Sequence, residues 1–140
     1  DTTTFYENFS PELLDTVIEL ESDRFQNLLI DEARMQTEKA VVLEERRLRV
    51  DSQPVARIQE ALWGMLFRVH PYSHPVSGWP QDVVQLSTQD LNDFFETYYQ
   101  PKNVVIVVVG DVNTASLIQK IQNAYGNWKP KRELKKPEIT

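Results

Sequence analysis

The sequence predicts an α+β fold, in which helices pack against a sheet that is incomplete within these 140 residues. The run Val104 to Val109 contains only valine and isoleucine, which is typical of a strand covered on both faces. Residues 31–50 contain neither glycine nor proline and are rich in good helix formers. Because two strands do not make a stable sheet alone, further strands are expected outside this sequence.

The first half of the chain predicts one strand and three helices. Residues 1–6 are rich in threonine and end in an aromatic pair, which favours a strand. Ser10 and Pro11 are typical of the cap and first position of a helix. A second helix is expected over 31–50, and Pro54 opens a third. The apolar face of this third helix comprises Ile58, Ala61, Leu62, Met65 and Leu66.

A loop and a fourth helix follow. Residues 70–80 hold three prolines and a glycine, so a loop is expected. Ser87 is predicted to cap the fourth helix, with Asp90 at the capping-box position. The short piece 83–86 is a further candidate strand, because the run 104–109 needs neighbours in a sheet.

A last helix and a basic tail complete the chain. Asn113 is predicted to cap this helix and Gly126 to end it as its C′ residue. From Lys129 onward the chain is basic, contains proline and has few apolar residues, which is typical of a linker. The predicted organisation is a partial domain over 1–128 and a basic linker or tail toward a second domain over 129–140.

The composition argues against several classes of function. A net charge of −6 makes nucleic acid an unsuitable partner, because a phosphate backbone requires a basic surface. The absence of cysteine excludes disulfides and thiolate metal sites, and it leaves a periplasmic and a cytoplasmic location both compatible. The longest strongly apolar run is far shorter than the roughly 20 residues that cross a bilayer, so no membrane span is expected.

Two glutamates seven residues apart, Glu38 and Glu45, are the first candidates for chemistry. Seven residues are nearly two helical turns, so both side chains leave one face, about 10 Å apart along the axis. Residues 40–43 between them are all apolar and predict a turn buried all round, where a carboxylate must be paired or coordinated. The alternative is a solvated face, on which Glu45 pairs with Arg49 and Glu38 with Arg34.

The two histidines are weaker candidates. His70 and His74 have a spacing that would make a metal pair on a helix, but Pro71 and Pro75 exclude a regular helix here. A role in loop structure or packing is expected instead. No serine lies in a glycine-rich elbow, and four glycines do not form a phosphate-binding loop.

The stretch TEKAVVLEERRLRVDSQP, residues 37–54, resembles the pitrilysin/insulinase family of inverted zincins, which includes bacterial zinc proteases and mitochondrial processing peptidases. Residues 1–25 resemble the strand and helix that precede this stretch in the family, and residues 70–113 resemble the segment that follows it. The resemblance implies a fold similar to the family's first domain, with an antiparallel-rich sheet but without its N-terminal strands and its H-x-x-E-H helix.

The resemblance also implies a site. In this family zinc is held by H-x-x-E-H on an earlier helix and by a downstream glutamate, the second of two that are seven residues apart. Glu45 would then be a zinc ligand, and Glu38 a supporting catalytic residue that orients its surroundings. The implied function is a zinc endopeptidase that hydrolyses a peptide or protein substrate with a metal-activated water, with a second related domain or subunit as partner.

One departure from the family pattern leaves two alternatives. The sequence contains no H-x-x-E-H, which would lie before Asp1. The chain is either part of a longer active enzyme or a non-catalytic family member that acts as a scaffold or substrate-binding subunit. The intact acidic pair and the abrupt start favour the first alternative. The isolated chain would then be inactive, and Zn²⁺ would be a cofactor of the full-length parent.

Overall fold

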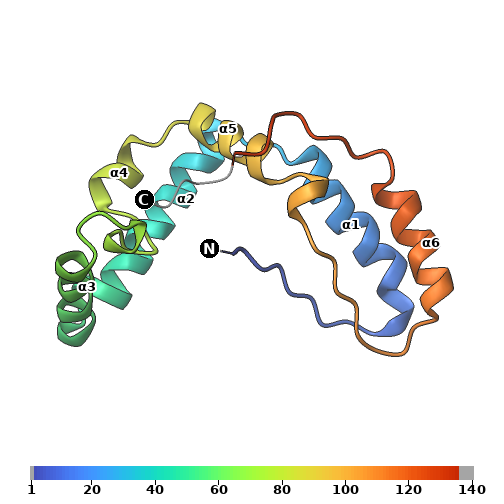
Figure 1. The fold of residues 1–140 in the computed structure, drawn as a ribbon, viewed down its shortest axis with the longest axis horizontal. Coiled ribbons are helices and arrows are strands. Elements are labelled where there is room, and N and C mark those ends of the chain that lie inside the picture. The colour runs from blue at the N-terminus through green and yellow to red at the C-terminus, as the bar shows by residue number, and fades with distance from the viewer. Residues whose placement is uncertain (1, 136–140) are drawn as a thin grey trace. The chain divides into compact units, whose positions relative to one another are not determined.

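The structure is a computed structural model that describes residues 2–135, and these form helices joined by loops (Figure 1). Within this range no residue belongs to a β-strand. The predicted α+β fold with an antiparallel-rich sheet is therefore wrong for the described chain, which is all-helical. The chain divides into two compact units, Asp1–Leu29 with Glu96–Leu134 (unit 1) and Ile30–Phe95 with Lys135–Thr140 (unit 2).

The described residues of both predicted strands, 2–6 and 104–109, lie in unit 1 as irregular chain. Val104 has the backbone angles of a strand, φ −122° and ψ 137°, yet no ladder of backbone hydrogen bonds joins 104–109 to another segment of residues 2–135. Val105, Val107 and Val109 are exposed. Strand composition therefore makes an extended chain here, but a strand also needs a paired neighbour, which the described residues do not supply.

Two long helices lie side by side in unit 1 (Figure 1). The side-chain amide of Gln26 donates to the backbone carbonyl of Ala124 over 3.1 Å, and Lys120 forms an ion pair with Asp15. The predicted first helix begins at Pro11, as expected, although the Ser10 side chain makes no capping bond to it. The elements of unit 1 are η1 (Pro11–Leu13), α1 (Leu14–Asn27), η4 (Pro101–Asn103) and α6 (Thr114–Tyr125).

An aromatic cluster holds the N-terminal segment against these helices. The Phe25 ring lies at its centre, with ring centroids 5.4 Å from Phe5, 5.9 Å from Tyr99 and 5.7 Å from Trp128. These separations are typical of favourable aromatic pairs. The cluster gives unit 1 a local core that does not depend on a sheet.

Unit 2 confirms the second, third and fourth predicted helices. The helix expected over 31–50 is formed by α2 and by a π-helical turn, η2; the others begin at Pro54 and directly after Ser87. The candidate strand 83–86 is wrong, because residues 83–85 belong to a short helix, α4. The elements are α2 (Glu32–Arg46), η2 (Arg47–Asp51), α3 (Pro54–Leu66), η3 (Pro71–Ser73), α4 (Pro80–Gln85) and α5 (Thr88–Tyr98), which continues into unit 1.

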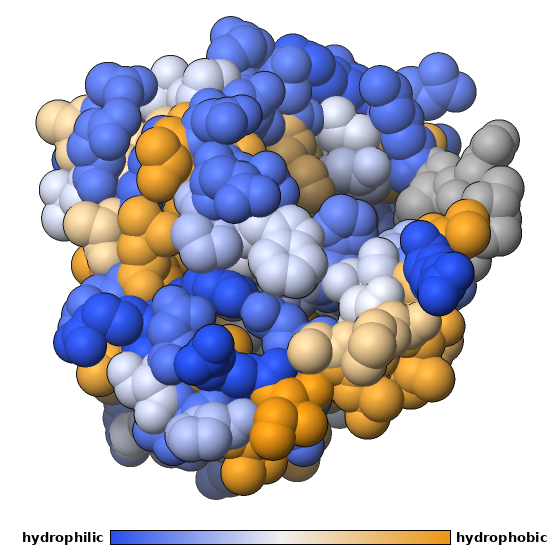
Figure 2. All heavy atoms as spheres, turned by 90° about the vertical axis from the view of Figure 1, so that its left-hand side faces the viewer, coloured by the Kyte–Doolittle hydropathy of each residue, from blue (hydrophilic) through white to orange (hydrophobic). Residues whose placement is uncertain are grey.

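Burial in unit 2 is less extensive than the sequence predicts. Met35 on α2 and Val83 on α4 are buried, and these two helices contact each other. The expected apolar face of α3 is open: Ile58, Leu62 and Met65 are all exposed. Figure 2 views this side of the molecule and shows hydrophobic side chains at the surface among hydrophilic ones.

The C-terminal predictions are confirmed in part. The Asn113 side chain accepts a hydrogen bond from the Ser116 amide at 3.0 Å and so caps α6. Gly126 follows the helix but has a right-handed φ of −61°, not the left-handed conformation of a C′ glycine. Residues 136–140 of the predicted linker, 129–140, lie outside the described part of the chain. Among residues 2–135 no helix has both the length and the apolar character needed to span a bilayer.

Candidate functional site

The acidic pair, Glu38 and Glu45, lies on α2, and a side-chain cap stabilises the start of this helix. The Asp31 carboxylate accepts a hydrogen bond from the Arg34 amide at 2.8 Å and caps the helix. α2 then continues without interruption to Arg46. Glu38 and Glu45 therefore leave the same helix face, as the spacing predicts. Both side chains are exposed.

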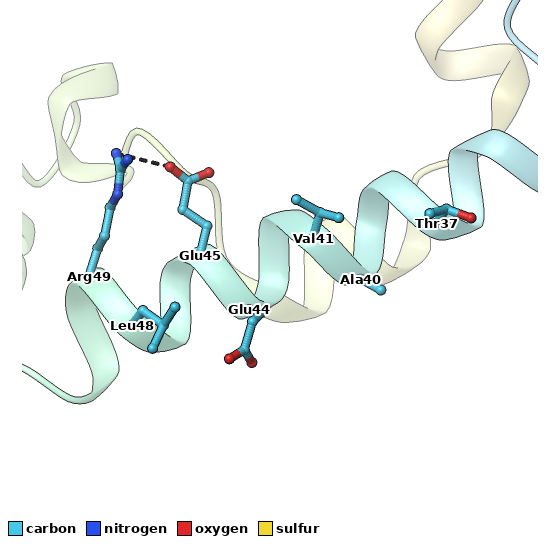
Figure 3. Close-up of a pocket in the computed structure, with 7 residues that line it drawn as sticks. All are labelled: Thr37, Ala40, Val41, Glu44, Glu45, Leu48 and Arg49. Carbon is cyan, nitrogen blue, oxygen red and sulfur yellow. Dashed lines mark ion pairs between the residues drawn. The ribbon is translucent and has the colours of Figure 1, made fainter.

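Glu45 forms the ion pair that its spacing suggests. Its Oε1 lies 2.9 Å from Nη1 of Arg49, one turn further along (Figure 3). Both partners are open to solvent, with side-chain exposures of 48% for Glu45 and 77% for Arg49. The predicted pairing of Arg34 with Glu38 is wrong, because Arg34 pairs with Asp31 at 3.1 Å.

A hollow on this helix face contains Glu45. Its lining comes from one stretch of helix, so it is a surface feature rather than an enclosed cavity (Figure 3). Glu44 points away from the Glu45–Arg49 pair and bonds Arg47, whose guanidinium lowers the pKa of that carboxyl. The lining residues are Thr37, Ala40, Val41, Glu44, Glu45, Leu48 and Arg49.

The turn between the two glutamates is not buried all round, which corrects the sequence-based expectation. Ala40 and Val41 are exposed, and Val42 and Leu43 are only half-buried. In the described chain α2 contacts α4 and, through Arg46, α3, and these contacts leave part of the apolar run in solvent.

A zinc site requires three or four ligand side chains close together. Within residues 2–135 no three His, Cys, Asp or Glu side chains come together as a metal site would need. His70 instead accepts a hydrogen bond from the Tyr72 amide through Nδ1 at 3.2 Å, and its ring packs against Phe67 and Tyr72. This confirms its expected role in loop structure. Glu45 fits one carboxylate ligand of a zinc site, and the described residues do not supply the others.

Sequence reasoning missed the residue after Glu45. Arg46 is only 6% exposed, and its guanidinium bonds both carboxylate oxygens of Glu60 on α3, at 2.7 and 2.8 Å. These bonds raise the pKa of Arg46 above its ordinary value. The signal in the sequence is its spacing: Arg46 follows the buried Met35 by eleven residues, close to three helical turns, and so falls on the inner face.

The chain is similar to known proteins in both sequence and fold. The family model described as "Peptidase M16 inactive domain" matches residues 85–140. The zinc protease PqqE of Helicobacter pylori is 32% identical over 119 residues, which are 85% of this chain and 27% of that protein. The crystal structure of a protease from Helicobacter pylori matches this chain with a TM-score of 0.78 and 30% sequence identity. The match covers 94% of this chain and 32% of the chain of that protease.

A further structure shows the same fold at lower identity. The first half of the periplasmic protease PqqL of Escherichia coli has a TM-score of 0.79 at 18% identity, over 94% of this chain and 28% of its own. This chain thus spans about a third or less of the relatives it matches. The matches to the two Helicobacter pylori proteins cover the acidic pair, and the family model covers the C-terminal segment that follows it. The chain therefore belongs to the pitrilysin/insulinase family, the M16 peptidases.

Proposed function

We propose that this chain is part of a zinc-dependent endopeptidase, in which Glu45 supplies the carboxylate ligand of the metal and Glu38 supports it. One observation carries the proposal: α2 presents Glu45 to solvent, seven residues after Glu38, with only an exposed ion pair to hold it. The relative named as a zinc protease supports the choice of metal.

The ion pair with Arg49 does not compete strongly with such a role. An exposed ion pair at this spacing typically contributes about 0.2–1 kcal/mol, because water screens both charges. A carboxylate–zinc bond in a site with two further ligands is far stronger. The carboxylate of Glu45 is therefore free to exchange Arg49 for a metal at little cost.

The remaining ligands would come from parts of a longer protein. Zinc that keeps a position for water lowers the pKa of that water to about 7 and so supplies a nucleophile for peptide hydrolysis. This chain would contribute one ligand and the helix that presents it, and would be inactive in isolation. The substrate would be a peptide or protein. A second related domain or subunit is an expected partner, since this chain spans about a third or less of the relatives it matches.

The test uses three glutamine variants of the full-length protein. Glu45→Gln should remove zinc and abolish hydrolysis, because the amide keeps the size of the side chain but loses its charge. Glu38→Gln should weaken metal affinity or activity by about 10–100-fold, as a residue that supports a ligand typically does. Glu44→Gln is the matched control, since Glu44 lies on the same turn but pairs with Arg47, and it should behave as wild type.

Zinc content by atomic absorption and turnover of a quenched peptide give the readouts. A Glu45→Gln variant with full zinc and full activity would show that the residue serves only the surface ion pair with Arg49. Equal losses in Glu44→Gln would show that the assay reports damage to the helix rather than loss of a ligand.

A second candidate is a non-catalytic scaffold or substrate-binding subunit. It is favoured by the family model matched at residues 85–140, which describes an inactive domain. The two candidates differ in the sequence that precedes this chain in the full-length protein. An H-x-x-E-H there together with zinc-dependent peptide hydrolysis supports the endopeptidase, and the absence of both supports the subunit.

A further inference from the structure

Arg46 joins three parts of unit 2 through one guanidinium. Besides the two bonds to Glu60 on α3, Nη1 lies 3.3 Å from the Gly78 carbonyl and 3.4 Å from the Ser77 hydroxyl. Its Cζ lies 5.8 Å from the centre of the Trp79 ring, within the range of a cation–π contact. One side chain thus ties the end of α2 to α3 and to the loop 77–79.

The same guanidinium bridges an irregular turn. α2 ends at Arg46, and η2 follows as a π-helical turn, closed by a hydrogen bond of 2.9 Å from the Ser52 amide to the Arg47 carbonyl. Nη2 of Arg46 lies 3.6 Å from Asp51 at the far end of that turn. π-turns are rare, occur mostly as single turns and are frequent at functional sites.

We propose that Arg46 is a positioning residue for Glu45: its bonds to Glu60, Gly78 and Asp51 fix the rotation of the helix end that carries the Glu45 carboxylate. This inference rests on the proposed function of Glu45. Successive residues point about 100° apart around a helix, so an inward-facing Arg46 leaves Glu45 directed sideways into the hollow. The anchor and the predicted ligand are neighbours that cannot rotate independently.

A small rotation would be enough to matter. Side-chain ends lie about 5–6 Å from a helix axis, so a rotation of about 10° moves the carboxylate by about 1 Å. Zinc–ligand distances are held within about 0.2 Å. The ion pair with Arg49 cannot hold Glu45 with this precision, because both side chains of the pair are exposed to solvent.

The experiment compares arginine variants in the full-length protein. Arg46→Lys keeps the charge but loses the fork that reaches Glu60 and Gly78 together. It should weaken zinc affinity about tenfold or more, measured by competition with a chromophoric chelator, and should speed amide hydrogen exchange in residues 44–51 and 77–79 of the zinc-free protein. Arg47→Lys is the matched control, because Arg47 is exposed one residue further along, and it should change neither readout.

A double variant separates positioning from folding. Arg46→Met alone leaves Glu60 without its partner and can prevent folding. Arg46→Met with Glu60→Leu removes both charges, and apolar replacement of a buried pair is often neutral for stability. The double variant should keep the wild-type melting temperature and still lose zinc affinity about tenfold or more.

Two results would overturn the proposal. Wild-type zinc affinity in both Arg46→Lys and the folded double variant would show that the pair is structural only. Wild-type amide exchange in Arg46→Lys would show that the guanidinium does not hold this turn. Zinc retained in Glu45→Gln is a separate result that rejects the proposed ligand, whereas the exchange data still decide whether Arg46 anchors the helix end.

Discussion

The Arg49 guanidinium lies 2.9 Å from the Glu45 carboxylate, and water reaches both groups. Arg49→Met should therefore change the free energy of unfolding by less than about 0.5 kcal/mol, because exposed pairs contribute little. Urea denaturation measures the change.

The buried neighbour provides the contrast to this prediction. Arg46→Met should cost about 3–5 kcal/mol, since it leaves the Glu60 carboxylate largely out of water without a partner. Similar losses for Arg46→Met and Arg49→Met would contradict the difference in burial between the two ion pairs.

Gly78 is predicted to be required in the loop that Arg46 holds. Its φ is +74°, a left-handed conformation, and a Cβ at this position would lie 3.3 Å from the Val83 side chain. Gly78→Ala should reduce stability by about 1–2 kcal/mol, because a left-handed backbone brings Cβ too close to the following carbonyl. The shift in the urea midpoint gives the value.

Gly64 is the matched control for that substitution. It lies inside α3, and nothing is within 4 Å of an added Cβ. Gly64→Ala should stabilise the protein by about 0.5–1 kcal/mol, since alanine restricts the unfolded chain and favours a helix. Destabilisation by both substitutions would show that the backbone argument for Gly78 is incomplete.

The cap of α5 predicts a pH dependence. The Ser87 hydroxyl and amide donate to the Asp90 carboxylate at 2.6 and 2.8 Å, and these bonds lower the pKa of Asp90 below its ordinary value of 3.8. A lowered folded pKa means that the stabilisation is complete above the ordinary value and is lost as the pH falls through the lowered one. The start of α5 should therefore loosen only in acid.

Titration of the Asp90 side-chain carboxyl carbon by NMR tests this pH dependence. Ser87→Ala removes the hydroxyl, the largest cause of the shift, and should move the pKa of Asp90 back toward the ordinary value. The remaining amide bond should keep part of the shift. An unchanged pKa in Ser87→Ala would assign the effect to other charges.

The helix starts were predictable because capping is local. Asn113 bonds an amide three residues ahead, and the Ser87–Asp90 pair spans the same distance. Such contacts need no partner from elsewhere in the chain, so the residue pattern alone indicates them. The spacing of Glu38 and Glu45 on one face of α2 is of the same kind, since the helix period fixes it.

The strands and the burial were not predictable in this way. The composition of 104–109 indicates an extended chain, but pairing requires a second segment, and residues 2–135 provide none. The apolar character of residues 40–43 and of one face of α3 predicts burial, but these residues are exposed or half-buried. Burial depends on which other elements pack against them, and the local pattern does not contain that information.

Adjacent arginines show most clearly where local pattern ends. Arg46 and Arg47 have the same chemistry, and by itself the sequence determined that they lie on a helix with Glu45 beside them. Only the tertiary structure decided that Arg46 turns inward to Glu60 and Gly78 while Arg47 remains at the surface with Glu44. The physical reason is that helix formation depends on nearby residues. The contribution of a charged side chain to stability depends instead on what surrounds it after distant segments have packed.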